Sequence, residues 1–253
     1  SPHARASAYA VVVGLESLAT VDNPLTGERV EAAMFFADRF SDDPQVPEVV
    51  ISAANLAFEA GDYAVAGMLA GDGLANSLVT PGAGELWRTA TLILGHSKFE
   101  LGDFAEAEAA YLRLLAQKPR DKAVRQRALA AVFQQGDVAR TAGDLNLAIG
   151  HLDRLMVIDP KDALSIAAMF DVASLFESLG QLNLAAERLE QFRKRFPRHE
   201  AVADIPKRLV ALYESTGESL PAARELLRIN KDGAEEPETR RLALYRAGEL
   251  LLE

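Results

Sequence analysis

The chain has 253 residues, of which 49% are hydrophobic and 25% are charged, a composition typical of a protein with a buried core. The formal net charge is -10, and residues 1–120 alone carry 8 Lys and Arg against 16 Asp and Glu, so nucleic acid is not an expected partner. The absence of cysteine excludes disulfides and thiolate zinc sites, and no stretch approaches the ~18 apolar residues of a transmembrane segment.

Residues 1–46 predict a helix pair. Apolar residues recur at helical spacing over 3–19 and 28–40, and the connecting sequence TVDNPLTG contains Asn-Pro and Gly turn signals. We expect this region to form a divergent N-terminal pair. The chain starts without Met, shows no signal-peptide layout and ends on RAGELLLE, which we interpret as the sign of a piece of a longer protein.

From residue 47 onward, glycine, alanine and proline recur at fixed offsets. Gly102, Gly143 and Gly180 are each followed by an alanine after 5 residues and by a proline after 17 residues. The segment before each glycine is helix-patterned, the glycine supplies the positive φ that ends a helix, and the proline stops the second helix. The pattern predicts consecutive helix–turn–helix units, with Asp62, Asp103, Asp144, Asp121 and Asp162 as helix caps.

The alanines of these units have a packing role. Ala107, Ala148 and Ala185 follow their glycines at the same offset, and Ala66 follows Gly61 in the same way. A small side chain at this position lets two antiparallel helices approach closely. We therefore expect these alanines to be buried.

These units resemble the tetratricopeptide repeat. The unit at 88–121 carries Leu94-Gly95, Gly102-Asp103-Phe104, Ala107, Tyr111 and Pro119 at the family's positions, and weaker units begin at 47, 129 and 166. The resemblance implies an all-α, right-handed superhelical solenoid of stacked antiparallel helix pairs. It assigns about five pairs to 47–231 and a capping or truncated helix to 232–253. Successive glycines lie 41, 41, 37 and 37 residues apart, more than the family period of about 34, so we expect longer first helices or links.

No catalytic motif is apparent. The four histidines, His3, His96, His151 and His199, lack metal-ligand spacing, and no phosphate-binding or nucleophile motif occurs. We expect no enzyme activity, no cofactor and no metal. Two basic clusters, at 118–127 and 193–198, are interpreted as solvated helix ends, with contact to an acidic partner or lipid headgroups as the alternative.

The resemblance also implies a concave face, lined by the first helix of each unit, that binds a protein or peptide. Ile51, Lys207 and Ala211 are possible groove positions in the less regular units. Phe133 and Phe170 could equally be core contacts between repeats. An apolar stripe with polar margins favours an amphipathic segment. The principal groove candidates are Asn55, Leu92, His96, Phe133, Asp137, Arg140, Phe170 and Ser174.

One family subtype is not expected. Its units clamp acidic chaperone tails with Lys, Asn and Arg at fixed groove positions, where this chain has Ile51, Asn55, Ile93, Ala130 and Gln134. Only Asn55 fits that pattern.

The sequence therefore predicts a protein–protein interaction scaffold that belongs to a larger bacterial protein or envelope assembly. The alternatives are a helical regulatory or sensory domain that binds a small molecule or signal peptide, and an accessory domain of an enzyme. The ending RKRFP resembles second-helix endings in bacterial cell-envelope repeat proteins, which favours envelope or periplasm over cytoplasm. The oligomeric state is not predicted.

Overall fold

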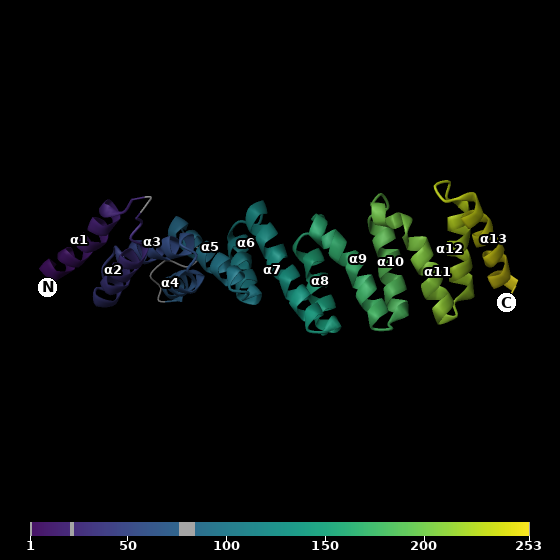
Figure 1. Ribbon diagram of the computed structural model, residues 1–253, viewed down its shortest axis with the longest axis horizontal. Helices are drawn as coiled ribbons and strands as arrows, with labels where there is room; N and C mark the ends of the chain where they lie inside the picture. The colour runs from purple at the N-terminus through teal and green to yellow at the C-terminus, as the bar shows by residue number, and fades with distance from the viewer. Residues whose placement is uncertain (1, 21–22, 76–83, 253) are drawn as a thin grey trace. The chain divides into compact units, whose positions relative to one another are not determined.

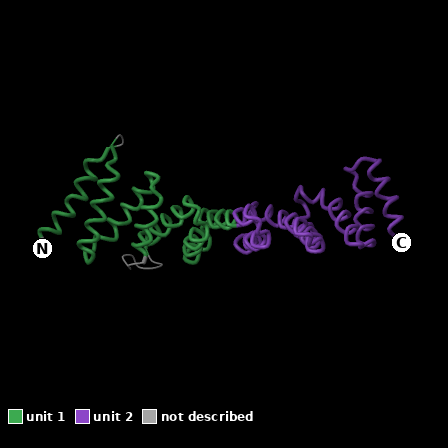
Figure 2. The backbone as a smooth tube through the Cα atoms, turned by 60° about the horizontal axis from the view of Figure 1, so that its bottom comes forward, with its two compact units in different colours: residues 1–135 green, residues 136–253 purple. Residues whose placement is uncertain are grey.

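The computed structural model describes residues 2–20, 23–75 and 84–252 (Figure 1). Over these residues the regular structure is entirely helical, with thirteen α-helices and one short 3-10 helix. The predicted all-α class is confirmed. The chain divides into two compact units, residues 1–135 and 136–253, which Figure 2 draws in green and purple.

Unit 1 is a series of helices in which the first six each pack on the next along the chain, and the sixth shares a hydrophobic cluster with the seventh. Helix α3 packs on α5 as well as on α4, so first helices of successive pairs are in contact. The helices are α1 (Pro2–Leu18), α2 (Thr26–Arg39), α3 (Val46–Glu59), α4 (Tyr63–Ala75), α5 (Gly84–Glu100), α6 (Phe104–Gln117) and the first part of α7 (Lys122–Thr141).

Unit 2 continues the same plan from the end of α7. Successive helices from α8 to α13 pack on one another. They are α8 (Leu145–Ile158), α9 (Ala163–Ser178), α10 (Leu182–Arg195), the 3-10 helix η1 (Glu200–Ala203), α11 (Ile205–Thr216), α12 (Ser219–Lys231) and α13 (Pro237–Leu252).

The repeated glycines end the first helix of each pair, as predicted. Their φ angles are all positive, in a region that residues with a Cβ rarely adopt. These glycines are Gly61 (82°), Gly102 (83°), Gly143 (83°), Gly180 (69°) and Gly217 (76°). The expected longer first helices are also present, since α5 has 17 residues and α7 has 20.

Most of the predicted aspartate caps form. Asp62 and Asp144 accept hydrogen bonds from the backbone N–H of Val65 (3.1 Å) and Leu147 (3.0 Å). Asp121 and Asp162 likewise cap α7 and α9. The cap predicted for Asp103 was wrong, because its carboxylate accepts a hydrogen bond from the ammonium group of Lys98 at 3.2 Å and makes no side-chain cap.

The core of both units depends on small residues where helices meet. Ala66, Ala107, Ala148 and Ala185 are completely buried, as expected. Ion pairs between alternate helices add to this packing in unit 2. Arg193 of α10 makes two hydrogen bonds, of 2.6 and 3.0 Å, to the buried Glu225 of α12.

Among the described residues, no helix is long and apolar enough to cross a membrane.

Candidate functional site

The predicted groove residues of unit 1 differ in accessibility. Asn55 is exposed on α3, where its amide donates a hydrogen bond to Oε1 of Glu59 at 2.8 Å. Leu92 on α5 is half-buried and packs against the core around Trp87 and Tyr111. Phe133 on α7 is also half-buried. These first-helix side chains keep part of their surface available to a partner.

His96 is tied into the packing of three helices. Its ring centroid lies 6.0 Å from that of Phe58 on α3 and 5.6 Å from that of Tyr111 on α6. The Tyr111 hydroxyl lies 3.3 Å from Nδ1 of His96, within hydrogen-bond distance, and Nδ1 accepts in the tautomer that carries its proton on Nε2. Burial, with a smaller contribution from the Arg127 charge, lowers the pKa of His96 to about 4. At neutral pH the imidazole is therefore uncharged.

In unit 2, Phe170 and Ser174 of α9 form one cluster with Arg208 of α11. The Arg208 guanidinium lies over the Phe170 ring, 4.8 Å from its centroid. It also donates hydrogen bonds to Oγ of Ser174 (3.1 Å) and to Oε1 of Glu177 (2.6 Å). The Phe170 ring meets the buried Phe192 ring edge-on at 5.3 Å. Phe170 thus serves as a core contact through Phe192 while remaining half-buried beside Arg208.

Charged side chains of both signs lie near this cluster. Asp137 and Arg140 form an ion pair at the end of α7. Asp171 is exposed as a residue, but neighbouring side chains displace water from its carboxyl and raise its pKa, and Arg140 and Arg208 partly oppose this change. On the first helices of unit 2, charged and polar side chains therefore lie around the Phe170 ring and the Arg208 guanidinium.

One of the secondary groove positions, Ile51, was wrong. Ile51 is only 2% exposed, because it lies on the face of α3 that packs against Gly73 of α4. Lys207 forms an ion pair of 2.6 Å with Glu235, near the start of α13. The next residue, Arg208, contacts Phe170, Ser174 and Glu177 and was missed, because the last unit is too irregular to fix its helical phase from the sequence.

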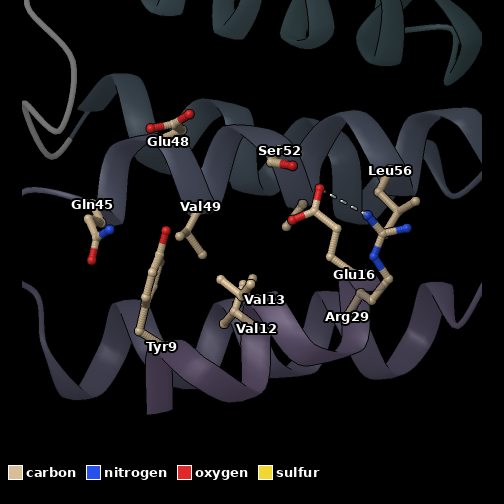
Figure 3. Close-up of a pocket in the computed structure, with 12 residues that line it drawn as sticks. Tyr9, Val12, Val13, Glu16, Arg29, Gln45, Glu48, Val49, Ser52 and Leu56 are labelled. Atoms are coloured by element: carbon tan, nitrogen blue, oxygen red, sulfur yellow. Dashed lines mark ion pairs between the residues drawn. The ribbon is translucent and has the colours of Figure 1, made fainter. Parts of the chain in front are cut away.

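A cleft in unit 1 was also missed. It has a volume of about 150 Å³ and lies between α1 and α3, with α2 contributing Arg29 and Ala33 (Figure 3). Tyr9, Val12 and Val13 of α1 face Val49, Ser52 and Leu56 of α3 across it. The sequence carries no local signal for this cleft, because it depends on how far α1 and α3 stand apart.

No group of three or more histidine, aspartate or glutamate side chains in the described part of the chain is arranged to hold a metal ion.

The folded units define a helix-pair repeat protein. Residues 167–199, which cover most of α9 and α10, match the family model of the tetratricopeptide repeat. This match and the consecutive helix pairs confirm the predicted resemblance to the tetratricopeptide repeat.

Several solved structures are similar to the chain. A tetratricopeptide repeat protein from Parabacteroides merdae is 14% identical, with 97% of this chain and 91% of that chain covered and a TM-score of 0.38. A tetratricopeptide protein from Thermus thermophilus is 19% identical, with coverages of 82% and 100% and a TM-score of 0.31. YrrB, described as having an unusual peptide-binding site, is 18% identical, with coverages of 85% and 97% and a TM-score of 0.36. These TM-scores are too low to support an argument about the site. No curated protein matches the chain.

Proposed function

We propose that the chain is a protein-interaction scaffold that binds a peptide segment or partner domain on its first-helix faces. The cluster of Phe170, Ser174 and Arg208 carries this proposal. An arginine held by a carboxylate and stacked on an aromatic ring is fixed before a partner arrives, so binding loses little side-chain entropy. Arginine and aromatic residues are also enriched among the side chains that dominate binding energy.

The partner expected on these faces is an amphipathic segment. Leu92 and Phe133 in unit 1 and Phe170 in unit 2 are half-buried, so each retains apolar surface that a partner can cover. Exposed polar residues lie on the same set of first helices, Asn55 on α3 in unit 1 and Ser174 on α9 in unit 2. An amphipathic helix laid into a groove uses this combination of apolar anchors and polar margin.

A peptide library displayed on phage and selected against the chain would test the proposal. Ser174→Arg places a long charged side chain on the first-helix face of unit 2 and should abolish capture of peptides that bind there. Asn183→Arg makes the same change on the exposed surface of the second helix α10 and should leave capture intact. The proposal fails if Asn183→Arg is the variant that removes binding, or if the selected peptides neither respond to Ser174→Arg nor protect α3 and α5 of unit 1 from hydrogen exchange.

A further inference from the structure

Apolar side chains from both helices line part of the cleft between α1 and α3. Val12 and Val13 of α1 and Val49 and Leu56 of α3 line it, and the Val13 side chain remains 41% exposed. Figure 3 shows the valines of α1 directed toward α3 across the open space. Apolar surface that is left accessible between two helices gains free energy when a partner side chain covers it.

The rim of the cleft is acidic. Glu16 of α1 and Glu48 of α3 are exposed lining residues, and Arg29 is the single cation among the lining residues. Arg29 stands 4.0 Å from Glu16 and also donates a hydrogen bond to the carbonyl oxygen of Pro24 at 3.4 Å. The lining thus holds two carboxylates and one guanidinium, which leaves the rim with a net negative charge.

A polar stripe with a glutamate at each end continues along α3 on the same side. Glu48, Ser52, Asn55 and Glu59 are spaced at i, i+4, i+7 and i+11, so they lie on one face of the helix, and all four are exposed. This stripe is about 16 Å long at 1.5 Å per residue, the length of a partner helix of about eleven residues. It joins the predicted groove residue Asn55 to the newly found cleft.

We propose that this cleft binds a basic amphipathic segment of a partner protein. Apolar side chains of the segment would cover Val13 and Leu56, and its Lys or Arg side chains would lie near Glu16 and Glu48 at the rim. The inference rests on the proposed function, because it gives a location and a charge to the partner. Charge complementarity is the reason for choosing a basic over a neutral or acidic segment.

Three fluorescein-labelled peptides that differ only in charge provide the probe. Each has the same leucines at helical spacing, and the flanking positions hold Lys, Gln or Glu. In fluorescence anisotropy at low salt, the Lys peptide should bind at least about tenfold more tightly than the Gln peptide, and the Glu peptide should bind most weakly. Raising the salt concentration should reduce the preference, because exposed charges are screened.

Variants of the chain locate the binding. Glu48→Lys should weaken binding of the Lys peptide at least about tenfold, and the milder Glu48→Gln should weaken it less. Glu31→Lys is the matched control, since Glu31 is exposed on α2 of the same unit and does not line the cleft. It should change the affinity by less than about twofold. Melting curves of all three variants verify that each is folded.

The inference is overturned if the Lys peptide does not bind, if the three peptides bind equally, or if Glu31→Lys weakens binding as much as Glu48→Lys. It is also overturned if Ser174→Arg, and not Glu48→Lys, removes binding of the Lys peptide. In each of these cases the proposed function still stands when library peptides sensitive to Ser174→Arg are found, so the two failures are distinguishable.

Discussion

Gly95 of α5 lies directly against the ring of Tyr111 of α6. A Cβ atom at position 95 would stand 2.8 Å from Cε1 of Tyr111 and 3.2 Å from Cβ of Ala110. Tyr111 is only 1% exposed, so its ring has little room to move away. The absence of a side chain at Gly95 therefore sets how closely these two helices pack.

Gly95→Ala should consequently destabilise the protein. Alanine favours a helix interior over glycine by about 1 kcal/mol, but overpacking against a buried ring costs about 1–3 kcal/mol, and we expect the steric cost to dominate. Gly150→Ala is the control, because Gly150 lies within α8 and a Cβ there meets no atom within 4 Å. Thermal unfolding should show a lower Tm for the first variant and an equal or higher Tm for the second. Stabilisation by Gly95→Ala would contradict the close approach of α5 and α6.

Ala148→Leu tests the alanine of the repeat. Ala148 is completely buried on α8, so three added heavy atoms should cost about 1–3 kcal/mol of unfolding free energy. Ala167→Leu, at an exposed position of α9 in the same unit, should be nearly neutral. Equal denaturant midpoints for the two variants would show that position 148 tolerates the larger side chain.

His96 should make stability depend on pH. Its folded-state pKa of about 4 lies below its unfolded value of 6.5, so the unfolded state takes up a proton first as the pH falls. The contribution of His96 is complete above pH 6.5 and is lost between pH 6.5 and 4, by about 2–3 kcal/mol. In urea titrations His96→Gln should reduce the loss over this interval, and an unchanged slope would contradict the burial of the imidazole.

Phe133→Ala distinguishes an anchor from a core residue. Phe133 is half-buried, and if it is a binding anchor the variant should lose about 2 kcal/mol or more of affinity for a selected peptide while retaining most of its stability. If it is a contact between repeats, the same change should cost about 3–5 kcal/mol of unfolding free energy. We expect the first result. A large fall in Tm with unchanged affinity of the remaining folded protein would remove Phe133 from the binding face.

The helix ends and the buried alanines of this fold were predictable, because each depends on residues that are close together in the sequence. The turn between two antiparallel helices needs a residue with a positive φ at the end of the first helix. Gly61, Gly102 and Gly143 therefore mark these turns in the sequence. A completely buried position such as Ala107 follows from the same spacing. Asp103 was mispredicted because a lysine five residues earlier competes for its carboxylate.

The missed features depend on contacts that no sequence window contains. Arg208 reaches Phe170, Ser174 and Glu177 from 31 or more residues away along the chain. The cleft between α1 and α3 depends on the separation of two helices, and glutamates at its rim look like any solvated acidic residue in the sequence. The groove residues of the middle units remain predictions until a bound partner is examined.

Hydrogen exchange of the chain, with and without a selected peptide bound, tests the central claim most directly. If partners bind on the first-helix faces, amide protection should increase in α3 and α5 of unit 1 or in α9 and α11 of unit 2, and the second helices α4, α6, α10 and α12 should change little. Protection concentrated in those second helices, with the first helices unchanged, would contradict the account.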